Sequence, residues 1–231
     1  MRLLELAFIL AIISCGVVFI VGQKSDYIIL MLNKDDLAPK TDTLVLVPTL
    51  TANAYKVGSF YDYYSGKCGA ECLTTTISYN VDLGEAGSEN AVRTLKRIGY
   101  VTELDFIVDY KLRTDPNWLE TYHTVIVLHN EYVTQRIFDA LQKHSHVVYL
   151  APNANHAMVS VDGPIMTLVQ GHGYNNMYNG FGWEYDNTSL ESDKECENWR
   201  FDPIPNGYQL NCNPELTIHS NIQLLKTLKD L

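Results

Sequence analysis

The chain has few basic residues, and they are not clustered. Its 231 residues contain 17 Lys and Arg against 27 Asp and Glu, which gives a formal net charge of −10 at pH 7. Proteins that bind nucleic acid neutralise phosphates with clustered Lys and Arg side chains. The composition therefore argues against nucleic acid as a partner, and the acidic surplus favours solubility.

Common catalytic motifs are also missing. No Gly-x-Ser-x-Gly or Gly-x-Cys-x-Gly turn follows a predicted strand, so no nucleophile held in such a turn is indicated. The chain contains neither the His-Glu-x-x-His motif of zinc proteases nor a Cys-x-x-Cys pair. Any enzyme chemistry must come from another arrangement of side chains.

One long hydrophobic run is present, near the N-terminus. Residues 6–22 read LAFILAIISCGVVFIVG and carry no charge. At about 1.5 Å per residue, this run approaches the roughly 30 Å thickness of the hydrocarbon layer. Three interpretations remain open: a membrane anchor, a cleaved signal ending near Gly22, and a lipoprotein signal at Cys15. The lack of an Ala-x-Ala cleavage site favours the anchor.

Each of these interpretations places the rest of the chain outside the cytoplasm. We therefore expect a single-pass protein of the cell membrane, with secretion as the alternative. The expected organisation is an anchor or uncleaved signal at residues 1–23, a connector at 24–42 and an extracytoplasmic domain at 43–231. With 46% apolar residues, that last segment is long enough for one sizeable core.

The cysteines beyond the N-terminal run fit an exported protein. There are four of them, and an even number in an exported chain predicts two disulfides. Of the three possible connectivities we expect Cys68–Cys72 and Cys196–Cys212. A zinc site is the rival interpretation, disfavoured because no His lies next to these pairs. The sequence Asn187-Thr188-Ser189 is a candidate glycosylation site.

The clearest structural pattern lies between residues 124 and 157. Apolar, β-branched runs at 125–128 and 147–150 are typical of parallel strands covered on both faces. Between them, apolar residues recur at helical spacing. The members of that stripe are Val133, Ile137, Phe138 and Leu141. The pattern predicts a strand, a helix and a second strand joined by a right-handed crossover.

Further elements extend this unit into a sheet. We expect strands at 43–47 and 102–108, a helix at 88–98 capped by Ser88, and a short helix at 116–121. This order favours an α/β fold with a doubly wound, mainly parallel sheet.

The C-terminal third is predicted to differ in character. Residues 158–161 and 165–169 suggest a hairpin, and residues 216–228 suggest a final helix. Between them, residues 171–215 show little periodicity and are expected to form an insertion clamped by Cys196 and Cys212. The long segment from 49 to 87 is rich in tyrosine, which is typical of a functional loop rather than a disordered one.

Polar side chains follow three of the predicted strands. Because the carboxyl ends of parallel strands share one edge of a sheet, these side chains should converge. The expected set is Thr49, Thr51, Tyr55, His129, Asn130, Glu131, Asn153, Asn155 and His156, with His172 approaching from the insertion. We expect Tyr55, Asn130, Asn153, His156 and His172 to bind a small polar ligand.

Two chemistries and one structural role suit this set. His129 and Glu131 are able to act as base and acid. Alternatively, His129, Glu131 and His156, with Tyr55, are able to hold a metal that activates water. In the structural interpretation, these residues cap helices and satisfy loop carbonyls, and Glu131 favours a nearby helix N-terminus. Sequence spacing alone leaves all three open.

Two stretches resemble a known family. The sequences VIVLHNEYVTQRIFDAL and VVYLAPNANHA, with TLVLVPTLTANAY upstream, resemble the C-terminal domain of the N,N-dimethylformamidase large subunit and the wider class I glutamine amidotransferase-like fold. The resemblance spans about residues 43–160. Amidotransferases of this fold carry a nucleophilic cysteine after a central strand, where this chain has His129-Asn130-Glu131. The resemblance therefore excludes glutaminase activity.

The formamidase branch is associated instead with iron held by tyrosine and glutamate. By motif, Glu131 would supply the carboxylate and Tyr55 one phenolate, with Tyr61 and Tyr100 as candidates for the second. Iron or another divalent metal is thus the candidate cofactor. Three functions are predicted: a ligand-binding or degenerate enzyme domain, a metal-dependent hydrolase of amide C–N bonds, and a structural cell-surface protein.

Overall fold

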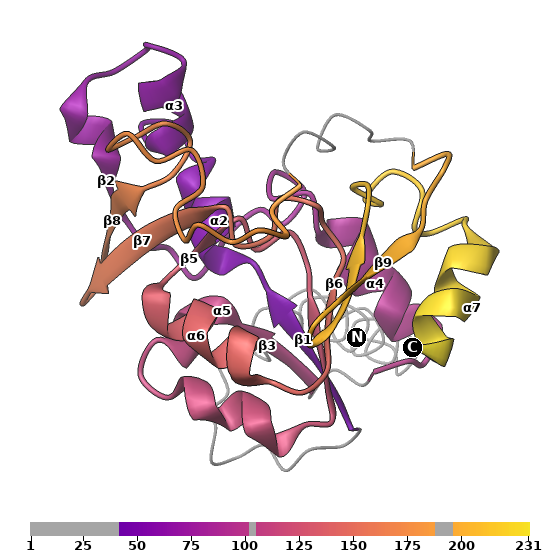
Figure 1. Ribbon diagram of the computed structural model, residues 1–231. Coiled ribbons are helices and arrows are strands. Elements are labelled where there is room, and N and C mark those ends of the chain that lie inside the picture. The colour runs from indigo at the N-terminus through magenta and orange to yellow at the C-terminus, as the bar shows by residue number, and fades with distance from the viewer. Residues whose placement is uncertain (1–41, 102–104, 188–195) are drawn as a thin grey trace, which may run out of the picture. The chain divides into compact units, whose positions relative to one another are not determined.

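The computed structural model describes residues 42–101, 105–187 and 196–231, all within the unit Pro39–Leu231 (Figure 1). The predicted anchor and most of the predicted connector lie outside the described residues, as do Thr188 and Ser189 of the glycosylation motif. Among the helices that the structure describes, none combines the length and apolar character needed to cross a membrane.

The main sheet has six strands in the order β3-β1-β4-β6-β10-β9. The first five are parallel to their neighbours, and β9 pairs antiparallel with β10. Their bounds are β1 Thr43–Val47, β3 Phe106–Val108, β4 Thr124–Val127, β6 Val147–Tyr149, β9 Phe201–Ile204 and β10 Gly207–Leu210. The central strands β1 and β4 bury nearly all their side chains, because both faces of the sheet are covered.

A second sheet of four strands has the order β2-β8-β7-β5. Strands β7 and β8 form the predicted hairpin, and β5 pairs parallel with β7. The bounds are β2 Thr74–Thr76, β5 Tyr132–Val133, β7 Ala157–Asp162 and β8 Ile165–Gln170. The fold is thus mixed α/β with parallel and antiparallel sheets, which confirms the predicted class in its broad form.

The helices fall into two groups by their contacts. Helix η4 contacts both α5 and α6, whereas residues just ahead of α7 bind the start of α4 through Glu215. Figure 1 shows these groups on either side of the main sheet. The bounds are α2 Thr49–Ala54, α3 Phe60–Tyr64, η2 Ala70–Leu73, α4 Glu89–Arg97, α5 Asp109–Leu112, η4 Pro116–Thr121, α6 Gln135–Lys143 and α7 Ile222–Asp230.

Several expected elements differ in the structure. Val133 was expected on a helix but lies in β5, and α6 starts only at Gln135, where Thr134 caps it by accepting a bond from the Ile137 N–H. The C-terminal helix starts at Ile222 rather than 216, because the Asn221 side chain caps it through the Leu224 N–H. The predicted insertion contains the β9–β10 hairpin, which extends the main sheet.

Both disulfide predictions are confirmed. Cys68 is bonded to Cys72, and Cys196 to Cys212. Such bonds are consistent with a domain outside the cytoplasm.

The two sheets meet where the site residues lie. The chain leaves β4 through His129–Glu131 and enters β5, and it leaves β6 through residues 150–156 and enters β7. Backbone bonds hold the two connections together: Asn155 N–H donates to the Asn130 carbonyl at 2.9 Å, and Ala157 N–H to the Glu131 carbonyl at 2.9 Å. These bonds hold the backbone of Glu131 at the point where the chain passes from the main sheet to the second sheet.

Candidate functional site

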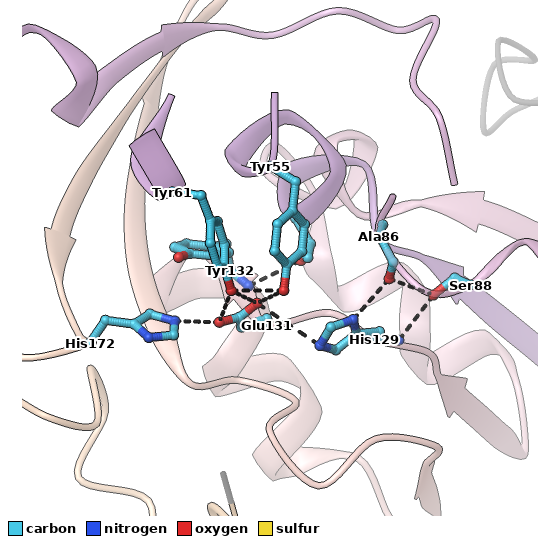
Figure 2. Close-up of polar contacts among 9 residues, drawn as sticks. Tyr55, Tyr61, Ala86, Ser88, His129, Glu131, Tyr132 and His172 are labelled. Carbon is cyan, nitrogen blue, oxygen red and sulfur yellow. Dashed lines mark hydrogen bonds and ion pairs between the residues drawn. The ribbon is translucent and has the colours of Figure 1, made fainter. Parts of the chain in front are cut away.

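Glu131 is the centre of the candidate site, and its side chain is fully buried. Tyr55 Oη donates to Glu131 Oε2 at 2.6 Å, and Tyr61 Oη lies 3.0 and 3.1 Å from the two carboxylate oxygens. The Nε2 of His172 contacts Glu131 Oε1. Figure 2 shows the two tyrosines reaching the carboxylate side by side from above and His172 reaching it from the left. A buried carboxylate is thus surrounded by two phenols and an imidazole.

The two tyrosines come from the short helices after β1. Tyr55 ends α2, whose six residues are all buried, and Tyr61 lies in α3. Their rings stack with centroids 4.0 Å apart, and Tyr61 Oη donates to Tyr55 Oη at 2.8 Å. Packing of α2 therefore positions one phenol, and ring stacking positions the other.

His129 flanks the carboxylate on another side. Its Nδ1 lies 2.8 Å from the Ala86 carbonyl oxygen, which accepts a bond and so places the proton on Nδ1. Its Nε2 is buried, has no hydrogen bond among the described residues and lies 3.9 Å from Glu131 Oε2. The ring therefore turns its Nε2 toward the Glu131 carboxylate (Figure 2).

His172 sits on a loop with an unusual backbone. Gly171, His172 and Gly173 have φ of 120°, 51° and 80°. A side chain at Gly171 would place its Cβ 2.8 Å from the Ala157 Cα, so only glycine fits there. Tyr64 Oη donates to the Gly171 carbonyl at 3.3 Å. The loop is thus packed tightly against β7 and α3.

The ring of His156 packs against the ring of His172. The two rings meet edge to face with centroids 4.2 Å apart. His156 Nδ1 lies 2.6 Å from Asp186 Oδ2, and Asn179 donates to the same oxygen at 2.8 Å. Asp186 and Asn179 were not among the predicted site residues, because they lie far from the strand ends in sequence.

The electrostatics of Glu131 favour its ionised form. Burial raises the pKa of this carboxyl, but the hydrogen bond and charge of His172, the charge of His129 and the Tyr55 bond outweigh burial and lower it to about 2. Burial and the negative charge of Glu131 raise the pKa values of Tyr55 and Tyr64 above the usual range. The tyrosines therefore stay neutral unless a cation replaces their protons.

A family match covers this site. A comparison with family models matches residues 17–206 to "N,N-dimethylformamidase beta subunit-like, C-terminal". The chain belongs to this family. Comparison with curated proteins gave no match. The matched range contains all the side chains that surround Glu131, and it ends before α7.

Other predicted residues of this dimethylformamidase-like domain have structural partners. Thr49 Oγ1 donates to Asp109 Oδ1 at 2.5 Å, and Asn130 Nδ2 donates to Asp109 Oδ2 at 3.0 Å. The Thr51 hydroxyl oxygen accepts a bond from the Tyr132 N–H at 3.1 Å. These contacts brace the turn that carries Glu131 and do not point to a ligand.

The remaining predicted site residues differ in whether they contact Glu131. Tyr100 donates to the Leu228 carbonyl at 3.3 Å, so of the two candidates for a second tyrosine, Tyr61 is the one at Glu131. Asn153 is fully buried, and its amide has no hydrogen-bond partner among the described residues. Asn155 has a left-handed φ of 61°, and Asn187 donates to Gln209 at 2.6 Å.

The donor set restricts which metal the site suits. The described residues contain no group of three or more His, Cys, Asp or Glu side chains placed to hold a metal. Any ion at Glu131 must therefore use the phenol oxygens of Tyr55 and Tyr61. Oxygen donors about 2.0 Å from a small, hard cation in octahedral geometry lie about 2.9 Å apart. The separations of 2.6, 2.8 and 3.0 Å among Tyr55, Tyr61 and Glu131 match this spacing.

Proposed function

We propose that this domain is a metal-dependent hydrolase of amide C–N bonds, with iron held by Tyr55, Tyr61 and Glu131. The convergence of two phenols on one buried carboxylate carries the proposal. The dimethylformamidase-like family supports the amide substrate class. When bound, such an ion would supply Lewis-acid activation of a carbonyl and of water.

His129 is assigned the proton transfer. Its Nδ1 is held by the Ala86 carbonyl, so Nε2 is free to take a proton from water as the water oxygen attacks the amide carbon. The same nitrogen then returns the proton to the leaving amine nitrogen as the C–N bond breaks. Water and amide thereby give a carboxylic acid and an amine, and His129 ends in its starting state.

The arrangement of the sheet supports the finer fold prediction. The five parallel strands follow the order β3-β1-β4-β6-β10, and β1 is the first of them in the sequence. This is the 2-1-3-4-5 order of flavodoxin-like sheets, whose ligands bind beyond the carboxyl ends of the strands. We infer a doubly wound, amidotransferase-like domain, anchored to the membrane by residues 6–22 and facing outward.

Metal content and amine release test the proposed function. The purified full chain, loaded with ferric salt, should hold about one iron per chain and release dimethylamine from N,N-dimethylformamide. Glu131→Ala and Tyr55→Phe should lose both properties. Tyr79→Phe is the matched control, because Tyr79 is exposed and bonds Tyr110 instead. Iron-free wild type, or full iron content in Glu131→Ala, would overturn the proposal.

A ligand-binding domain without turnover is the second candidate. Tyr55, Tyr61 and His172 already contact the Glu131 carboxylate. The arrangement of these side chains therefore does not depend on the domain catalysing a reaction. On this alternative, iron or a small polar amide binds, yet no amine is released from formamides or acetamides at any pH. Calorimetric titration with an amide, run beside the amine assay, separates the two candidates.

A further inference from the structure

We propose that His172 is a fourth donor to the ion, beside Tyr55, Tyr61 and Glu131. The inference rests on the proposed function, since it concerns the same ion. The Nε2 of His172 contacts Glu131 Oε1, whereas the shortest tyrosine bond goes to Oε2. The imidazole thus faces the carboxylate edge that the tyrosines cover least.

The ring of His172 is held in place by aromatic neighbours. It stacks on Tyr132 with centroids 5.7 Å apart and an interplanar angle of 22°, and it meets His156 edge to face at 4.2 Å. Packing against neighbouring rings restricts the orientation of an aromatic side chain. His156 is itself fixed by Asp186 at 2.6 Å. We therefore assign Asp186 as a positioning residue that acts through the rings of His156 and His172.

The backbone conformation of His172 also holds its side chain near Glu131. Its φ of 51° lies in the left-handed region, which a residue other than glycine seldom adopts. Gly171 is pressed against Ala157, and its carbonyl accepts a bond from Tyr64. A residue in this conformation persists only where its surroundings hold it, and here they aim its side chain at Glu131.

The second imidazole near Glu131 is placed for another role. His129 Nε2 lies 3.9 Å from Glu131 Oε2, farther away than any of the other three side chains. Its ring is fixed by the Ala86 carbonyl rather than by groups around the ion. His172 is therefore the donor, and His129 remains available for proton transfer.

The charge of the four donors selects the oxidation state. Two phenolates and one carboxylate carry three negative charges, and a neutral imidazole adds none. A trivalent cation neutralises this buried set, whereas a divalent cation leaves one uncompensated negative charge, which is costly in a buried site. Hard oxygen donors also disfavour softer ions. We therefore expect the site to prefer iron(III) over zinc(II).

Spectroscopy of the iron(III)-loaded full chain tests the donor assignment directly. Pulsed electron paramagnetic resonance should detect one directly coordinated nitrogen in wild type. His172→Gln should lose that signal and bind iron(III) at least about tenfold more weakly in competition with a chelator. His129→Gln, the matched control, should keep both the nitrogen signal and the affinity. Asp186→Asn should keep the nitrogen signal but change its coupling.

The outcomes separate this inference from the proposed function. If wild type binds iron(III) without a coordinated nitrogen, or His172→Gln keeps the signal and the affinity, His172 is not a donor. If wild type binds no iron, or Tyr55→Phe binds it equally well, the proposed function itself fails. The wild-type nitrogen measurement needs no variant, so a His172→Gln chain that does not fold leaves the inference testable.

Discussion

At the scale of single residues, Glu131 combines full burial with a pKa of about 2. The folded chain therefore binds this proton more weakly than the unfolded chain, in which the carboxyl has its ordinary pKa of 4.5. Its contribution to stability is fully present above about pH 5 and is lost as the pH falls toward 2, to the extent of roughly 3 kcal/mol.

Urea unfolding of the metal-free chain at pH 7 and pH 3 checks this prediction. Wild type should lose more free energy of unfolding between the two pH values than Glu131→Gln does. Glu120→Gln, at an exposed position, should behave like wild type. Equal losses in wild type and Glu131→Gln would contradict the lowering of the Glu131 pKa by His172, His129 and Tyr55.

The His129 side chain gives a second prediction at this scale. His129→Gln should lower kcat for amide hydrolysis by about 10²- to 10⁴-fold, which is the range that a positioned acid or base contributes. Iron content should stay unchanged, because His129 Nε2 is 3.9 Å from Glu131 and is not assigned to the ion. Steady-state kinetics and elemental analysis on the same preparation provide the check. A parallel loss of iron would instead make His129 a ligand.

At the scale of elements, Asp109 joins α2, α5 and the turn before β5. Its carboxylate accepts four bonds, from the Leu50 and Tyr110 N–H groups and from the Thr49 and Asn130 side chains. Burial raises its pKa to about 6, although the four donors lower it. The folded chain thus holds this proton more tightly than the unfolded chain does.

This shift acts in the opposite direction to that of Glu131. The contribution of Asp109 to the free energy of unfolding should fall by roughly 3 kcal/mol as the pH rises from about 4 to about 6, and then stay level. Asp109→Asn should remove most of this slope, while Asp109→Ala should destabilise the chain at every pH by leaving four donors unpaired. Thermal unfolding in steps from pH 4 to pH 7 measures both effects. An unchanged slope in Asp109→Asn would contradict the assignment.

Elements with a strong apolar pattern were predictable, and those without one were not. Strands β4 and β6 are continuous apolar runs and lie where expected. Helix α2 was missed because all six of its residues are buried, so it has no polar face to reveal a helical period. Strand β9 was missed because it is an edge strand that contains Pro203, a residue that normally argues against a strand.

The same limit applies to the candidate site. His129 and Glu131 closely follow β4, and Tyr55 follows β1 after the short helix α2, so the shared edge of a parallel sheet predicts their convergence. The contact of His172 with Glu131 joins residues 41 apart, and that of Asp186 with His156 joins residues 30 apart. His172 was expected to approach the site, but its contact with Glu131 and that of Asp186 with His156 depend on how an irregular segment packs, which local patterns do not specify.

At the scale of the whole molecule, the disulfides and the N-terminal run support one location. Disulfides such as Cys68–Cys72 and Cys196–Cys212 persist in oxidising compartments, so they are consistent with a domain outside the cytoplasm. Residues 6–22 approach the length that a membrane-spanning helix needs, and no Ala-x-Ala cleavage site follows them. We therefore predict that the full chain stays in the membrane fraction after alkaline extraction, with the domain open to added protease from outside.

The intact mass of the membrane-extracted protein decides among the three N-terminal interpretations. An anchor leaves residues 1–22 in place, a cleaved signal removes them, and a lipoprotein begins at a lipid-modified Cys15. Alkaline extraction also distinguishes an anchor from a cleaved signal, because a chain that has lost its apolar run is released into the soluble fraction. The acidic domain itself has no electrostatic attraction to anionic lipid that would keep it on the membrane. Recovery of the domain in the soluble fraction with residues 1–22 missing would refute the anchor, and the site chemistry would then belong to a secreted protein.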